Sequence, residues 1–187
     1  GDMGEAEKNA LLALYMNPGA EYGTLVGNIY AARGAPTLAI DAYEKALATP
    51  GVVQTPEVHQ NLAQLYEGER RFNDALRHYI SAVELDSTYA PAFKCAARLY
   101  ALGNQNDRAG QFFLRYSQLA PDDAEGWFGQ AEAFTNLGLN KRALEVAEKA
   151  YALNSEDPRI RLALARVTYL AGDLERSERL YADVPDT

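Results

Sequence analysis

Histidine, cysteine and acidic side chains are the groups in this 187-residue chain that could bind a metal or act in catalysis. The two histidines, His59 and His78, lie 19 positions apart, and the single cysteine, Cys95, follows 17 positions later. Ligands that share one helix face need spacings of three or four residues, so these three residues have no metal-ligand pattern. The sequence therefore predicts no metal site and no bound cofactor.

Two pairs of neighbouring carboxylates are the remaining candidates for acid–base chemistry, Asp122 with Asp123 and Glu156 with Asp157. Each pair precedes a predicted helix, where a carboxylate caps free backbone N–H groups and interacts favourably with the helix dipole. The chain has neither a phosphate-binding glycine loop nor a nucleophile-elbow motif. Because no catalytic set can be assembled from these residues, we expect a protein that is not an enzyme.

A repeated pattern of small and large apolar residues runs through most of the chain. Equivalent positions recur from residues 20, 56, 90, 124 and 158, so successive copies begin 36, 34, 34 and 34 residues apart. A period of 34 residues is typical of an array of helix–turn–helix repeats. We therefore predict an all-α fold, a right-handed α–α superhelix of antiparallel helix hairpins, as one domain over residues 1–187. Its predicted parts are a leading half repeat over 1–19 and repeats over 20–55, 56–89, 90–123, 124–157 and 158–187.

Small residues occupy two places in every copy, where paired helices must approach closely. The eighth place of the repeat holds Gly27, Ala63, Ala97, Ala131 and Ala165. The facing place on the second helix holds Ala39, Ala75, Ala109, Ala143 and Ser177. Larger apolar residues follow at helical spacing and fill the remaining space, so nearly all aromatic residues and leucines are predicted to form the core.

Turn and capping residues indicate where the helices begin and end. Thr55 and Asp157 each precede a proline, and Asp123 precedes Ala124, as capping residues do. Glycines, which adopt a left-handed backbone at least cost, mark three of the turns between paired helices: Gly34, Gly138 and Gly172. The predicted first helices are 20–33, 56–69, 90–103, 124–137 and 158–171, and the second helices are 36–48, 72–86, 106–120, 140–154 and 173–182.

The second, fifth, ninth and twelfth places of each first helix share one face, because their spacings are three and four. In stacked hairpins the first helices line the concave side, so this stripe is a candidate groove for a partner. In chain order the stripe contains Glu21, Thr24, Asn28, Ala31, Glu57, Gln60, Gln64, Glu67, Pro91, Lys94, Arg98, Ala101, Glu125, Phe128, Glu132, Thr135, Arg159, Leu162, Arg166 and Tyr169.

Nine residues of the stripe are predicted to contact a partner: Asn28, Gln60, Gln64, Lys94, Arg98, Phe128, Glu132, Arg166 and Tyr169. Their amide and guanidinium groups would bond the backbone of an extended peptide, while Phe128 and Tyr169 receive an apolar side chain. We expect Lys94, Arg98, Phe128 and Arg166 to form the centre. A solvated helix face accounts for the same polar residues, and the sequence leaves that alternative open.

The repeat pattern resembles the tetratricopeptide family over nearly the whole chain. The resemblance implies a scaffold or adaptor that binds another protein or a peptide. One subclass of the family binds the acidic carboxy-terminus of heat-shock chaperones through a clamp of basic and asparagine residues. Asn28 and Asn61 occupy its asparagine places, but Thr24, Pro91 and Cys95 stand where basic residues are needed, so this clamp is incomplete.

Several segments also resemble the pilotin-type proteins of type IV pilus biogenesis: 45–51, 55–56, 61–62, 89–94, 97–98 and 113–116. Those proteins are lipid-anchored in the periplasm and assist assembly of the outer-membrane secretin ring. The resemblance implies a role in bacterial envelope or pilus assembly. The chain departs from that family at residues 25–30, which lack its cysteine, and in a further full repeat that replaces its closing segment.

Net charge and hydropathy narrow the choice of partner. The formal net charge of −8 disfavours binding to nucleic acid phosphates and to anionic lipid. No apolar stretch approaches the length that spans a membrane, so we expect no direct membrane insertion by this segment. A single cysteine excludes an internal disulfide and leaves the compartment undecided. The predicted location of the protein is periplasmic or outer-membrane-associated if the pilotin resemblance holds, and otherwise cytoplasmic.

The alternative function is a self-assembling structural module. No polar helix closes the carboxy-terminal end of the array, so end helices of two chains could stack and form a homo-oligomer. Light scattering over a concentration series distinguishes this module from a monomeric scaffold.

Overall fold

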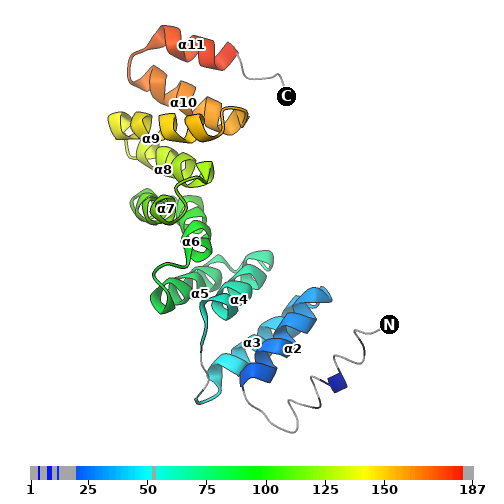
Figure 1. The fold of residues 1–187 in the computed structure, drawn as a ribbon. Helices are drawn as coiled ribbons and strands as arrows, with labels where there is room; N and C mark the ends of the chain where they lie inside the picture. Colours follow the sequence, from blue (N-terminus) through cyan, green and yellow to red (C-terminus); the bar gives the residue numbers. More distant parts are fainter. Residues whose placement is uncertain (1–3, 5–7, 10–11, 13–19, 52–53, 183–187) are drawn as a thin grey trace. The chain divides into compact units, whose positions relative to one another are not determined.

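The chain forms consecutive antiparallel helix pairs (Figure 1). The computed structural model describes residues 4, 8–9, 12, 20–51 and 54–182. In these residues the named elements are all helices, and none is a strand, which confirms the predicted all-α fold. The helices are α2 (Ala20–Ala32), α3 (Pro36–Ala48), α4 (Pro56–Gly68), α5 (Phe72–Leu85), α6 (Ala90–Leu102), α7 (Asn106–Leu119), α8 (Ala124–Asn136), α9 (Asn140–Leu153), α10 (Pro158–Leu170) and α11 (Leu174–Ala182).

The helices belong to two compact units, Gly1–Tyr89 and Ala90–Thr187. Unit 1 contains the hairpins α2–α3 and α4–α5, and unit 2 contains α6–α7, α8–α9 and α10–α11. Each hairpin matches one predicted repeat, and the helix bounds agree with the predicted ones to within about a residue. The prediction of a single domain stays a prediction. The predicted half repeat over 1–19 lies outside the described residues, apart from residues 4, 8–9 and 12.

One backbone motif closes the first helix of every described repeat. A residue with positive φ follows the helix in each turn: Gly34 (67°), Arg70 (58°), Asn104 (56°), Gly138 (72°) and Gly172 (93°). The N–H of the next residue then bonds to the carbonyl five residues earlier, at 2.8–3.1 Å, as in a Schellman motif. The three glycine turns are confirmed, whereas the other two use an arginine and an asparagine.

Aspartates cap the first helices of the last two repeats as predicted. The Oδ1 atoms of Asp123 and Asp157 accept hydrogen bonds from the backbone N–H groups of Glu125 and Arg159, each at 2.9 Å. The prediction for Thr55 is wrong, because it precedes α4 in an extended conformation but its side chain makes no capping bond. Threonine is a weaker capping residue than aspartate.

The predicted small residues do separate closely packed helices. A Cβ atom on Gly27 would lie 2.7 Å from the ring of Tyr43, and the facing Ala39 is fully buried. In the last hairpin the Ser177 hydroxyl donates to the Ala165 carbonyl at 2.9 Å. The eighth-place residues therefore set the distance between the two helices of a pair.

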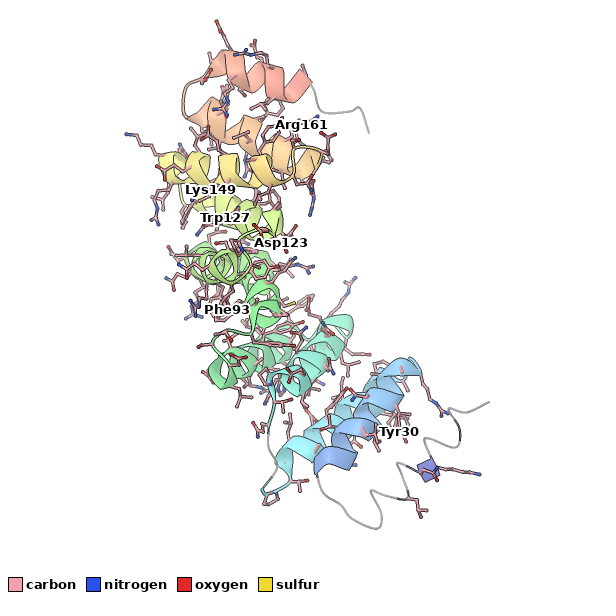
Figure 2. All side chains as sticks on the ribbon, in the orientation of Figure 1. Tyr30, Phe93, Asp123, Trp127, Lys149 and Arg161 are labelled. Carbon is pink, nitrogen blue, oxygen red and sulfur yellow. The ribbon has the colours of Figure 1, made fainter. Side chains whose placement is uncertain are left out.

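One hydrophobic cluster of unit 2 lies between α8, α9 and α10. Its buried residues are Ala131, Phe134, Ala143, Val146, Ala147, Leu164 and Val167. Trp127 packs against this cluster, and Lys149 Nζ lies 4.6 Å from its ring centroid (Figure 2). Not every aromatic residue is buried, since Phe72 and Tyr181 are 40% and 45% exposed. The prediction that nearly all of them are core is therefore too broad.

Candidate functional site

An open hollow of about 330 Å³ lies beside the first helices of the last two repeats in unit 2. It is lined by Phe128, Glu132, Arg159, Leu162, Ala163, Arg166 and Tyr181. Three of the predicted partner-binding residues, Phe128, Glu132 and Arg166, are thus brought together around one concave surface.

The helical register explains why these side chains meet. Phe128 and Glu132 are four residues apart on α8, and Leu162 and Arg166 are four apart on α10, so each pair lies on one helix face. α8 also packs against α10, which places the two faces side by side. Tyr181 of α11 contributes the last wall of the hollow.

The charged groups at the hollow neutralise one another. Arg166 Nη2 donates to Glu132 Oε1 at 2.6 Å, and both side chains remain partly exposed. Arg159 Nη2 donates to Asp157 Oδ2 at 2.7 Å and to Glu125 Oε2 at 3.3 Å. Hydrogen bonding from Arg159 lowers the pKa of Asp157, so this carboxyl group is charged at neutral pH. The hollow therefore combines apolar walls with a rim of ion pairs.

The Arg159 guanidinium also covers an aromatic wall of the hollow. Its Cζ atom lies 5.4 Å from the Phe128 ring centroid, within the range of a cation–π contact. Arg159 and Leu162 belong to the predicted stripe but were not among the nine predicted contacts, and Tyr181 was predicted to be core. Tyr181 occupies the same repeat place as Phe113, which is buried, so the repeat pattern alone indicated burial.

The other predicted residues of unit 2 lie elsewhere. Lys94 Nζ donates to Asp123 Oδ2 at 3.0 Å and lies 5.3 Å from the Tyr116 ring centroid, so its charge is engaged at the start of α8. Arg98 is exposed on α6, and Tyr169 is 58% exposed on α10. None of the three lines the hollow.

The predicted residues of unit 1 form a polar surface on α2 and α4. Asn28 Oδ1 accepts a bond from Asn61 Nδ2 at 3.3 Å and another from the Tyr43 hydroxyl at 2.5 Å. Gln64 is exposed, whereas Gln60 is half-buried and its Oε1 atom has no hydrogen-bond partner in the described part of the chain. The two asparagine places compared with the chaperone clamp are therefore adjacent in space.

The two histidines lie 19 positions apart in the sequence but are in contact in unit 1. His59 Nδ1 and His78 Nδ1 lie 2.9 Å apart between α4 and α5. No three or more His, Cys, Asp and Glu side chains gather into a group that could hold a metal ion within the residues that the structure describes. Over that same part of the chain, none of the helices has the length and apolar character needed to cross a membrane.

Comparison with known proteins identifies the repeats. The tetratricopeptide repeat family matches residues 56–89 and, through a second profile of the same description, residues 137–187. No curated protein sequence matches the chain.

Solved structures with similar folds share little sequence with this chain. The MamA protein superposes with a TM-score of 0.78 at 20% identity, covering 87% of this chain and 88% of its own. MamA from Desulfovibrio magneticus RS-1 superposes with a TM-score of 0.77 at 15% identity, and the match covers 88% of this chain and 92% of that MamA chain. YrrB, a TPR protein with an unusual peptide-binding site, superposes with a TM-score of 0.75 at 20% identity, and the match covers 85% of this chain and 81% of the YrrB chain. The chain therefore contains tetratricopeptide repeats, within residues 56–89 and 137–187, in an all-α fold similar to those of MamA and YrrB.

Proposed function

We propose that this chain is a protein-interaction scaffold that holds an extended segment of a partner against its first helices. Tetratricopeptide repeats typically mediate protein–protein interaction. The similar fold of YrrB supports peptide binding, because that protein has a peptide-binding site. The observation that carries the proposal is the hollow of unit 2, where apolar walls and paired charges lie together.

The hollow is suited to one apolar side chain of the partner. Phe128, Leu162 and Tyr181 supply its apolar walls, and burial of a Leu- or Phe-sized side chain there contributes about 1.5–3 kcal/mol. Glu132 and Arg166 compensate each other, so binding leaves no unpaired charge behind. The guanidinium of Arg166 keeps donors that can bond a partner's backbone carbonyl.

The remaining predicted residues are proposed as partner contacts within each unit taken separately. In unit 2 these are Lys94, Arg98 and Tyr169. In unit 1 they are Asn28, Gln60 and Gln64, whose amide groups suit a peptide backbone. The enzymatic alternative has no supporting residue set, and we propose a non-catalytic role.

The test uses short random peptides displayed on phage, selected on the intact chain and then measured individually by fluorescence anisotropy. Phe128→Ala and Leu162→Ala remove apolar walls and should weaken the selected peptides roughly tenfold to a hundredfold. Leu153→Ala is the matched control, since Leu153 is exposed to a similar degree as Leu162 but does not line the hollow. Unchanged affinity in the Phe128→Ala, Leu162→Ala double variant, with a native circular dichroism spectrum, would exclude the hollow as the site.

The resemblance to pilotin-type proteins supports a place for this scaffold in bacterial envelope or pilus assembly. In that setting the partner is a subunit of an outer-membrane assembly, and the compartment is the periplasm. Co-purification with the secretin of the source organism, lost on Phe128→Ala and kept on Leu153→Ala, is the expected result. A secretin that neither binds the chain nor needs it to form rings would contradict this role.

The exposed apolar side chains of α11 favour self-assembly as a second candidate function. Leu174 and Tyr181 are 55% and 45% exposed, although Tyr181 occupies the repeat place at which Phe113 is buried. A second copy could cover them by stacking helix against helix. Light scattering over a concentration series on the wild type and on Tyr181→Ser tests this candidate. A monomeric mass at every concentration for both proteins would exclude self-assembly.

A further inference from the structure

The only two histidines of the chain face each other across the second hairpin of unit 1. His59 lies on α4 and is 5% exposed, and His78 lies on α5. The ring of Tyr66 stacks on His78, with centroids 5.6 Å apart and an angle of 13° between the planes. Neither histidine lines the hollow of unit 2, so the proposed binding site does not account for this contact.

The amide oxygen of Gln54 indicates which ring nitrogens of the two histidines carry a hydrogen. Gln54 Oε1 lies 3.2 Å from His59 Nε2, which therefore carries a hydrogen and donates it. His59 Nδ1 then has a free lone pair and accepts a hydrogen bond from the N–H of His78 Nδ1. A first proton can enter at His78 Nε2 without breaking this bond. A second proton must enter at His59 Nδ1, which leaves two N–H donors facing each other.

We propose that His59 and His78 form a pH-dependent contact that holds α4 against α5 at neutral pH and opens when both imidazole rings are protonated. Two like charges at this separation repel strongly in a buried setting, and neither ring could then accept a hydrogen bond.

Burial is the main factor that keeps the two rings neutral. Burial, followed by the charges of His59 and Arg77, lowers the pKa of His78 to about 4, although Glu44 and Asp74 act in the opposite direction. Burial also lowers the pKa of His59. Both groups thus bind protons less readily in the folded state than in the unfolded chain, where histidine titrates at about 6.5.

Tyr66 connects this pair to the first hairpin. Its hydroxyl donates to Glu44 of α3, and Arg71 lies 4.3 Å from its ring centroid. Burial and the Glu44 carboxylate raise the pKa of Tyr66 to about 12, so the hydroxyl remains a donor throughout the acidic range. Displacement of His78 would remove the ring on which Tyr66 stacks, and the attachment of α3 to α4 would weaken with it.

The direction of the effect follows from proton linkage. Because both folded-state pKa values are depressed, the stabilisation is fully present above about pH 6.5. It is lost progressively as the pH falls from about 6.5 toward the folded-state value of about 4 for His78. Open forms of the α4–α5 hairpin, in which the rings are solvated, therefore become more populated on mild acidification.

Imidazole nuclear magnetic resonance on the full chain tests the titration directly, because the chain has two histidines and each single His→Asn variant assigns the other. The expected result is that His78 remains uncharged at pH 5, with strong coupling between the two titrations. Two independent titrations near pH 6.5 in the folded chain would overturn the proposal.

Hydrogen–deuterium exchange at pH 7 and pH 5, corrected for intrinsic rates, tests the opening. Protection of α4 and α5 should fall at least about tenfold at pH 5 relative to unit 2, which contains no histidine. In the double variant His59→Asn, His78→Asn the amide groups can bond each other but do not titrate, so this fall should disappear. An equal fall in protection in the double variant would refute the proposal. If that variant does not fold, the titration of the wild-type imidazole resonances is the deciding test.

Discussion

Gly129 of α8 packs against the ring of Phe113 on α7, and its replacement by alanine should destabilise unit 2. A Cβ atom at Gly129 would lie 2.3 Å from Cζ of Phe113, with two further ring atoms within 2.6 Å. Phe113 is only 3% exposed, so its ring cannot swing into solvent to make room. Overpacking of this kind typically costs about 1–3 kcal/mol, which exceeds the roughly 0.5–1 kcal/mol that alanine contributes over glycine inside a helix.

Gly110 provides a matched control at the same helix pair. It is also buried within a helix, but a Cβ atom there would meet Ala133 and Phe134 at 3.6 Å, an ordinary contact distance. Gly110→Ala should therefore stabilise the protein by about 0.5–1 kcal/mol. The two substitutions are chemically identical and should differ in sign because only one creates a steric clash.

Urea unfolding followed by tryptophan fluorescence measures both variants. Trp127 is the single tryptophan and lies two residues from Gly129, so it reports on the affected helix. Adding Phe113→Leu should recover part of the loss in Gly129→Ala, as a coupling energy in a double-mutant cycle. Stability of Gly129→Ala equal to that of the wild type, or a loss unaltered by Phe113→Leu, would refute the steric explanation.

Three further substitutions follow from buried, strained or capping groups. Gln130 is 2% exposed and its Oε1 atom lacks a hydrogen-bond partner among the described residues, so Gln130→Leu should raise the free energy of unfolding by about 1–3 kcal/mol in urea titration. Arg70 has a φ of 58°, so Arg70→Gly should raise the melting temperature through a gain of about 1 kcal/mol, and a decrease would contradict the assigned turn. Asp123→Ala should cost about 1 kcal/mol at pH 7, because the carboxylate caps α8. Although burial opposes the shift, bonds from Tyr116, the α8 backbone and Lys94 lower the pKa of Asp123, so this cost should be present above about pH 4 and vanish as the pH falls below it.

Much of the fold follows from local residue chemistry. The helix predicted over 124–137 is observed as Ala124–Asn136, because an aspartate caps its start and a glycine ends it. The turns at Arg70 and Asn104 adopt the same backbone conformation without glycine, so only the repeat period could place them. Thr55 shows the converse case, in which a suitable residue type occupies a capping place and makes no bond.

The candidate site was predictable in part. The spacing of Phe128 and Glu132 along α8 was enough to place them on one helix face. Their pairing with residues one repeat later also follows from the period, since Arg166 lies 34 residues after Glu132. The exposure of Tyr181 was not predictable from its repeat place, because burial depends on which helix covers a side chain.

The 34-residue period, the small eighth-place residues and the glycine turns are sufficient to infer paired helices and their inner stripe, since these features act within one repeat or between neighbouring ones. Folding alone decides which side chains then bond. The contact between His59 and His78, the engagement of Lys94 by Asp123 and the hollow beside Arg166 depend on rotamers and on distances between helices. These quantities arise from packing in three dimensions, and residue spacing along a chain does not contain them.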